Sequence, residues 1–558
     1  MNQPTTNPVP RTATSTPASA GANVFGDAPV PTSAHPPAPL IFERDVQIPM
    51  RDGVVLRGNL YRPADGAAAP VLMNFGPYGK DLSLAARQKD YYDALGKGVF
   101  LNWETPDPEY WVPRGYAVLR VDSRGSGASP GLLDAFSAAM ARDHYDAIEW
   151  AGTQPWSTGN VGLLGISFYA MTQWTVAALQ PPHLTAMMPW EGAVDAYRDF
   201  IRHGGILNAD FMRLWGGGIL AARNPGSEAV NLFDRARAHP LDDAAYTDWT
   251  PDLGKIEVPF VSVGNWGNLM LHLRGNIEGF VHAASSEKWL RILVGGHILP
   301  FYSPEALALQ ESFFGHYLKG EDTGWQDQPP VRVALRGADG ITWRDDTGWP
   351  LTGTEWRDLY LDATELRLGD SIPASDGVAE YPAPEGTVSF LLPPGHDIRE
   401  ITGPVAVRLW VSSSSVDADF YVTLRQITAG GDEVFGINPV DQPIQPLAQG
   451  WLRASHRKTD PARSLPYRPY LAHDERQDLV PDEVVAVDIE VWPTSIVLAR
   501  GDQLLLDISS SDNETIHVRM DSDEQERPAA RFDGTNRIHT GPNHPSALRL
   551  PVMPADPS

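Results

Sequence analysis

The chain has 558 residues, which is too long for a single hydrophobic core and predicts two or three domains. Its formal net charge of -26 argues against nucleic acid or an anionic membrane as a partner, because both would be repelled. The absence of cysteine excludes disulfides, thiol catalysis and cysteine-ligated metal sites.

Residues 1–38 are rich in proline, threonine, alanine and serine, and they lack an apolar core behind a basic start. We therefore expect a disordered tail here and not a secretory signal peptide. Nowhere do eighteen apolar residues run together, so we expect no membrane span and a cytoplasmic protein.

Between residues 39 and 327, strand-like and helix-like segments alternate. The apolar runs have the length of buried strands and lie at 70–75, 116–121, 161–165, 184–190, 260–264 and 290–294. This alternation predicts an α/β fold, a mainly parallel sheet covered by helices on both faces, with ligands at the carboxyl ends of the strands. Residues 193–255 interrupt the rhythm with helical segments that carry Trp and Phe. We interpret them as a helical cap inserted between 39–192 and 256–327.

From residue 328 to 558 the pattern becomes all-β. In residues 485–491, aliphatic side chains alternate with carboxylates and other small or polar residues, which is the period of a half-buried strand. Several such strands joined by turn-rich segments predict a C-terminal β-sandwich of roughly jelly-roll type.

Ser167 ends an apolar strand-like run and is followed at once by the helix-like residues 168–179. This strand, tight turn and helix is how α/β-hydrolases expose a nucleophilic serine, and Gly165 gives the helix room to leave the strand. The pattern predicts a serine hydrolase.

Eight short motifs then give the chain a family resemblance. The motifs lie at residues 74–80, 122–127, 154–156, 165–168, 172–174, 295–297, 450–457 and 491–495. With these motifs the chain resembles the family of cocaine esterase, X-prolyl dipeptidyl-peptidase and α-amino-acid ester hydrolase over nearly everything after residue 40. The resemblance implies an α/β-hydrolase domain, a helical cap and a C-terminal jelly roll.

The resemblance also implies the catalytic roles. Ser167 would attack an ester or amide carbonyl, with a histidine taking its proton and later donating it to the leaving group. His297, just beyond the strand 290–294, stands where that histidine belongs, and His272 is its nearest rival. The oxyanion hole would consist of the backbone N–H of Phe168 and the phenol of Tyr78.

The acid of the triad departs from the family pattern. Members commonly have Gly-Gly-Trp-Tyr-Asp in the loop where this chain has Gly-Asn-Trp-Gly-Asn, ending at Asn268. An amide cannot stabilise an imidazolium as a carboxylate does. Glu191 and Asp195 follow the neighbouring strand 184–190, and we expect Glu191, nearest the strand tip, to be the acid. The alternative for Glu191 is a solvated carboxylate or a salt bridge to Arg198.

We therefore expect a serine hydrolase that cleaves a small-molecule ester or amide through an acyl-enzyme, with no cofactor and no metal. Trp174 and Trp266 are candidates for the wall of the acyl pocket. The alternative enzyme is an X-prolyl dipeptidyl-peptidase or α-amino-acid ester hydrolase. The alternative outside the enzyme class is a disabled hydrolase that only binds ligand, and Asn268 alone supports it. Self-association of the chain stays open.

Overall fold

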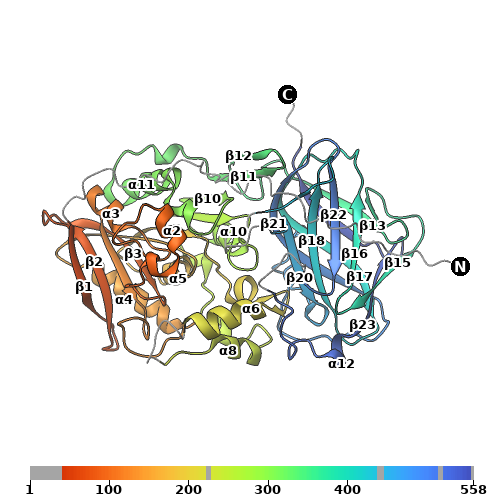
Figure 1. Cartoon of the computed structure of the whole chain (residues 1–558), viewed down its shortest axis with the longest axis horizontal. Coiled ribbons are helices and arrows are strands. Elements are labelled where there is room, and N and C mark those ends of the chain that lie inside the picture. The colour runs from red at the N-terminus through yellow and green to blue at the C-terminus, as the bar shows by residue number, and fades with distance from the viewer. Residues whose placement is uncertain (1–39, 221–227, 437–444, 513–518, 555–558) are drawn as a thin grey trace.

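The computed structural model describes residues 40–220, 228–436, 445–512 and 519–554 (Figure 1). The expected N-terminal tail, 1–38, lies outside these residues. Within them, no helix combines the length and the apolar character that crossing a membrane requires.

The N-terminal half is built on a mainly parallel sheet, as predicted. Strand pairing runs β1-β2-β4-β3-β5-β6-β9-β10, and only β1 and β2 are antiparallel to their neighbours. Because β3, β4, β5, β6, β9 and β10 run in the same direction, their carboxyl ends meet at one edge of the sheet. The strands are β1 (Leu40–Pro49), β2 (Val55–Pro63), β3 (Ala69–Gly76), β4 (Ala117–Asp122), β5 (Ser157–Ile166), β6 (Leu184–Trp190), β9 (Phe260–Asn265) and β10 (Lys288–Leu293).

Successive strand residues point to opposite sides of this sheet, so its apolar strands present side chains on both faces, and helices cover both. Leu163 packs in one core with α4 (Ala138–Gly152), α5 (Phe168–Ala177) and α10 (Leu273–His282). Leu164 packs in the other core with α11 (Pro304–Lys319). Shorter helices α1 (Leu84–Arg87), α2 (Lys89–Ala94) and α3 (Pro108–Trp111) lie between β3 and β4.

The sheet continues beyond residue 327, where we expected the catalytic domain to end. β11 (Val331–Gly337) pairs in parallel with β10, and β12 (Gly340–Asp346) pairs antiparallel with β11. The apolar alternation of these strands resembles that of the strands that follow them, and alternation does not reveal which sheet a strand joins.

The segment expected to form a cap contains short helical pieces and a two-stranded hairpin. In Figure 1 its helices α6 and α8 lie between the parallel sheet and the C-terminal strands. Its elements are η2 (Ala196–Ile201), β7 (Arg202–His203), β8 (Ile206–Leu207), α6 (Ala209–Phe211), η3 (Met212–Ile219), α8 (Leu232–Ala238), α9 (Ala244–Thr247) and η4 (Leu253–Lys255).

The C-terminal domain is all-β, as predicted. Pairing closes in the order β13-β24-β17-β21-β20-β18-β22-β16-β14-β13. In addition, β23 pairs with β17, β15 pairs with β23, and β19 pairs with β18. One apolar core fills its interior. The elements are β13 (Glu355–Asp362), β14 (Arg367–Gly369), β15 (Gly377–Ala383), β16 (Thr387–Leu392), β17 (Glu400–Ser413), β18 (Asp419–Ile427), β19 (Glu433–Val434), β20 (Ala448–Arg453), β21 (Val485–Val497), β22 (Gln503–Ser509), α12 (Ala529–Phe532), β23 (Gly534–Thr540) and β24 (Ala547–Val552).

The C-terminal domain holds the hairpin of the inserted segment. The backbone N–H of Arg453 donates to the carbonyl of Gly204 at 2.8 Å. A Cβ at Gly204 would lie 1.9 Å from the carbonyl oxygen of Trp451, so only glycine permits this approach. Buried Arg202 also pairs with Glu526 at 2.7 Å, which ties the same hairpin to the second domain.

Candidate active site

Ser167 lies on the sharp turn between β5 and α5, as the sequence predicted. Its backbone has φ 59° and ψ -120°, a conformation that is strained for a residue with a side chain. A Cβ at Gly165 would lie 2.7 Å from the Cβ of Tyr169, which explains the glycine two residues before the serine. Glu191 and Glu104, at φ 51° and 62°, share this rare backbone region.

The side chain that contacts Ser167 is His272 and not His297. The serine Oγ lies 3.0 Å from His272 Nε2. His272 precedes α10, in the loop that follows β9. Its Nδ1 accepts a hydrogen bond from the backbone N–H of Ala193 at 3.2 Å. Burial, and after it the charge of nearby His297, lowers the pKa of His272 well below its usual value.

His297 is held between two glutamates. Its Nδ1 lies 2.9 Å from Glu191 Oε2, and its Nε2 lies 3.0 Å from Glu104 Oε1. Burial disfavours the charged ring, but the two carboxylates outweigh burial and raise the pKa of His297 to about 10. The His297 ring is nearly parallel to that of His272, with centroids 6.3 Å apart. The expected direct contact between Ser167 and His297 is therefore wrong for this structure, because Glu104 occupies the nitrogen that would face the serine.

Glu191 lies where the sequence placed it, at the tip of β6 and against His297. It is 1% exposed and accepts hydrogen bonds from the side-chain amides of Asn265 and Asn268. Asn268, at the usual position of the acid, thus contacts the carboxylate and not the imidazole. Arg198, the alternative salt-bridge partner for Glu191, pairs instead with Asp195 at 3.0 Å and with Asp242 at 2.6 Å.

The two expected oxyanion donors are neighbours. Phe168 is the first residue of α5, where backbone N–H groups have no partner within the helix. The Tyr78 ring packs edge-on against Phe168, with centroids 6.3 Å apart. Tyr78 Oη accepts a hydrogen bond from Trp215 Nε1 at 2.9 Å, and this bond does not use the phenol proton.

Trp174 and Trp266 are core residues, and the structure does not bring them to the serine. Trp174 is fully buried against Phe260 and donates to the carbonyl of Gly192 at 3.1 Å. Trp266 is fully buried and donates to the carbonyl of Ala334 at 2.6 Å. Their candidate role in the wall of the acyl pocket has no support in these contacts.

Other aromatic side chains surround Phe168, and the sequence analysis did not single them out. Trp215 and Trp249 lie 5.5 and 6.2 Å from the Phe168 ring, and Phe136 lies 5.9 Å from it. Phe200 lies 5.9 Å from the His272 ring. Trp215, Trp249 and Phe200 come from the inserted segment, whose Trp and Phe content was the one available signal. Glu104 had no such signal, because it lies in an irregular loop between α2 and α3.

Comparison with known proteins identifies the family of this chain. Residues 52–298 match the X-Pro dipeptidyl-peptidase (S15) family, and residues 323–549 match the X-Pro dipeptidyl-peptidase C-terminal non-catalytic domain. A solved CocE/NonD family hydrolase from Staphylococcus aureus is 34% identical, covers 92% of this chain and 94% of its own, and superposes with a TM-score of 0.84. The chain belongs to the CocE/NonD family of hydrolases.

More distant relatives of this CocE/NonD hydrolase extend the same picture. Cocaine esterase from Rhodococcus sp. is 27% identical over 91% of this chain and 98% of its own length. An α-amino-acid ester hydrolase, 17% identical with a TM-score of 0.67 over 99% of this chain, shares the fold. The chain is thus a serine hydrolase with an α/β-hydrolase domain and a C-terminal non-catalytic domain.

Proposed function

We propose that this CocE/NonD hydrolase cleaves a small-molecule ester or amide through an acyl-enzyme on Ser167. The observation that carries the proposal is the Ser167 hydroxyl, presented on a strained turn and 3.0 Å from an imidazole nitrogen. An isolated serine is a weak nucleophile and needs a nearby base to activate it.

Hydrogen bonding favours His297, and not His272, as that base. Because His272 Nδ1 accepts the Ala193 N–H, the neutral ring carries its proton on Nε2. That nitrogen then donates to Ser167 Oγ and cannot accept the serine proton. His297 instead has a carboxylate, Glu191, on Nδ1, which is the arrangement that stabilises an imidazolium in a catalytic triad. We infer that His272 is a positioning residue for the serine hydroxyl.

The structure then corresponds to a resting state. Catalysis requires neutral His297 to leave Glu104 and bring Nε2 to Ser167 while Glu191 keeps Nδ1. The serine Oγ forms a bond to the substrate carbonyl carbon as its proton passes to His297 Nε2. The electron pair of the carbonyl moves to its oxygen, which the Phe168 N–H and the Tyr78 O–H stabilise. His297 next protonates the leaving oxygen or nitrogen as its bond to the former carbonyl carbon breaks and the carbonyl re-forms. Water then gives its proton to His297 and attacks the acyl-enzyme, and the bond from the acyl carbon to Ser167 Oγ breaks as His297 returns the proton to Oγ, which releases the acid.

In the resting arrangement, the charges around the site favour an ordinary ester or amide over a substrate with a free α-ammonium group. Recognition of ammonium requires a carboxylate without a competing cation. In the described loops at this sheet edge, Glu104 and Glu191 contact His297, while Asp195 pairs with Arg198 and Asp199 with Arg274. The aromatic residues around Phe168 suit an apolar acyl group.

The second domain has a supporting part in this proposal. We propose that its closed order of strands is a β-sandwich of jelly-roll type and that residues 193–255 form a cap over Ser167. The contacts of Gly204 and Arg202 with the C-terminal domain support a role in fixing that cap.

Two measurements test the proposed function. A fluorophosphonate should label the protein stoichiometrically, and Ser167→Ala should abolish labelling and ester hydrolysis while leaving thermal unfolding unchanged. A Gly-Pro-anilide and its N-acetyl derivative test the alternative, because cleavage of the free amine alone would favour an X-prolyl dipeptidyl-peptidase. Labelling that persists in Ser167→Ala would overturn the proposal.

A further inference from the structure

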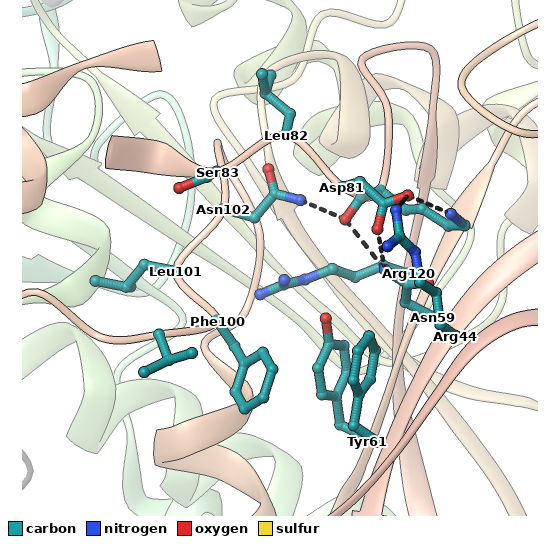
Figure 2. Close-up of a pocket in the computed structure, with 13 residues that line it drawn as sticks. Arg44, Asn59, Tyr61, Asp81, Leu82, Ser83, Phe100, Leu101, Asn102 and Arg120 are labelled. Carbon is teal, nitrogen blue, oxygen red and sulfur yellow. Dashed lines mark hydrogen bonds and ion pairs between the residues drawn. The ribbon is translucent and has the colours of Figure 1, made fainter. Parts of the chain in front are cut away.

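A second pocket lies on the edge of the parallel sheet where β1 and β2 are found. Its volume is about 190 Å³ (Figure 2). The walls come from the β1–β2 pair, the loop after β3 and residues 99–102. Neither Ser167, Tyr78, His272 nor His297 lines it. The lining residues are Phe42, Arg44, Asn59, Tyr61, Lys80, Asp81, Leu82, Ser83, Val99, Phe100, Leu101, Asn102 and Arg120.

Arg120, on β4, is a buried cation that lines this pocket. The residue is 1% exposed, and its Nη2 donates to the carbonyl of Pro106 at 2.8 Å. Its Nε has no hydrogen-bond partner, and among the described residues no carboxylate forms an ion pair with the guanidinium. Figure 2 shows the side chain extending across the pocket, with its guanidinium among Asn102, Leu101 and Phe100.

Three other buried arginines of the chain, Arg202, Arg453 and Arg336, have more partners than Arg120. Arg202 pairs with Glu526 at 2.7 Å, and Arg453 pairs with Asp419 at 2.8 Å. Arg336 lacks a carboxylate but donates to three oxygen atoms, on Ser495, Leu447 and Thr494. Because a buried charge without an ion-pair partner is destabilising, Arg120 favours an anionic partner from outside the chain.

The charges around the pocket leave Arg120 as the unbalanced one. Lys80 Nζ lies 2.6 Å from carboxylate oxygens of both Asp45 and Asp81, and Arg44 lies 3.1 Å from Asp81. These two cations are therefore neutralised within the protein. In a chain of net charge -26, a pocket lined by a cation with no carboxylate at ion-pair distance among the described residues favours an anion.

Three aromatic rings also line the pocket. Phe42 and Tyr61 stack with centroids 4.7 Å apart, and Phe100 meets Tyr61 edge-on at 5.0 Å. The guanidinium of Arg120 lies 5.3 Å from the Tyr61 ring centroid. An apolar cavity of about 150 Å³ is large enough for benzene, so 190 Å³ accommodates one ring with a small polar substituent.

We propose that this pocket binds a small aromatic monocarboxylate. Its carboxylate would take the unused donors of Arg120, since guanidinium and carboxylate match in a two-pronged hydrogen bond. Its ring would pack against Phe42, Tyr61 and Phe100. Asp81 at the rim disfavours a dianion such as phosphate.

The pocket also adjoins the active-site loops. Asn102 Nδ2 donates to the carbonyl of Lys80 at 2.8 Å, which joins two of its walls. Lys80 is two residues from Tyr78, and Asn102 is two residues from Glu104. The site therefore lies beside the catalytic centre but is separate from it.

Calorimetric titration of the full chain with benzoate, benzamide and inorganic phosphate tests the proposal. Benzoate should bind saturably, with benzamide and phosphate each at least tenfold weaker. Arg120→Gln and Val99→Trp should each weaken benzoate binding at least tenfold. Val99 is 77% exposed at the pocket mouth, so its substitution tests the site even where loss of Arg120 impairs folding.

Val480→Trp is the matched control. This valine is 60% exposed and lies in the C-terminal domain away from the pocket, so benzoate affinity should stay within twofold of wild type. The proposal is overturned by three results: no saturable benzoate binding, equal binding in Val99→Trp and wild type, or phosphate binding more tightly than benzoate.

Discussion

The contact between Glu104 and His297 makes an unusual prediction, because removing a buried carboxylate should raise activity near neutral pH. Glu104→Gln keeps a hydrogen-bonding oxygen near His297 Nε2 but removes one of the two charges that hold the ring protonated. His297 must be neutral to accept the serine proton. In the wild type, its pKa of about 10 leaves few molecules in that state at pH 7.

The size of the effect follows from the distance. Two unit charges about 4 Å apart interact by about 4 kcal/mol at an effective dielectric constant of ~20. At about 1.4 kcal/mol for each pKa unit, loss of Glu104 should lower the pKa of His297 by roughly 2–3 units. The neutral fraction at pH 7, and with it kcat/KM, should rise roughly a hundred- to fivehundredfold.

The assay is kcat/KM for a p-nitrophenyl ester from pH 5 to 10, whose acidic limb reports the pKa of the free enzyme's base. Glu149→Gln is the matched control, because Glu149 pairs with His183 at 2.8 Å and not with His297, so its loss should leave the limb unmoved. If Glu104→Gln lowers activity at every pH without moving the limb, Glu104 only supports the loop and the reasoning fails.

Three further substitutions test the site. Glu191→Gln should lower turnover at least hundredfold, because Nδ1 of His297 loses its carboxylate; a loss below fivefold with folding intact would reject Glu191 as the acid. Tyr78→Phe should lower kcat by roughly 10²–10³ with KM little changed, as expected for a lost oxyanion donor, and an equal rise in KM would point to substrate binding instead. Gly165→Ala should lower the free energy of unfolding by about 1–3 kcal/mol in denaturant melts, because the new Cβ collides with Tyr169. The control Gly348→Ala, whose Cβ would have no heavy atom within 4 Å, should lower it less. Equal losses in the two variants would contradict the packing argument.

Features encoded locally could be predicted from the sequence. The apolar runs that form the parallel strands β3, β4, β5, β6, β9 and β10 are long enough to be recognised as buried strands. The turn from β5 through Ser167 into α5 is specified by adjacent residues, including Gly165. The position of Glu191 after β6 followed from strand order in the same way.

Features that depend on long-range packing could not be predicted. His272 reaches Ser167 because the loop after β9 folds back over the sheet edge, and no spacing in the sequence records that path. Glu104 meets His297 across 193 residues. Trp174 and Trp266 were candidates for the pocket wall, and tertiary packing places both in the core.

Rapid-quench mass spectrometry of the acyl-enzyme tests the central claim most directly. With a p-nitrophenyl ester, the wild type should accumulate the acyl mass on Ser167, His297→Gln should acylate about 10³-fold more slowly or worse, and His272→Gln should stay within about tenfold of wild type. An acyl group on another residue, or a collapse of acylation in His272→Gln with His297→Gln unaffected, would contradict the account.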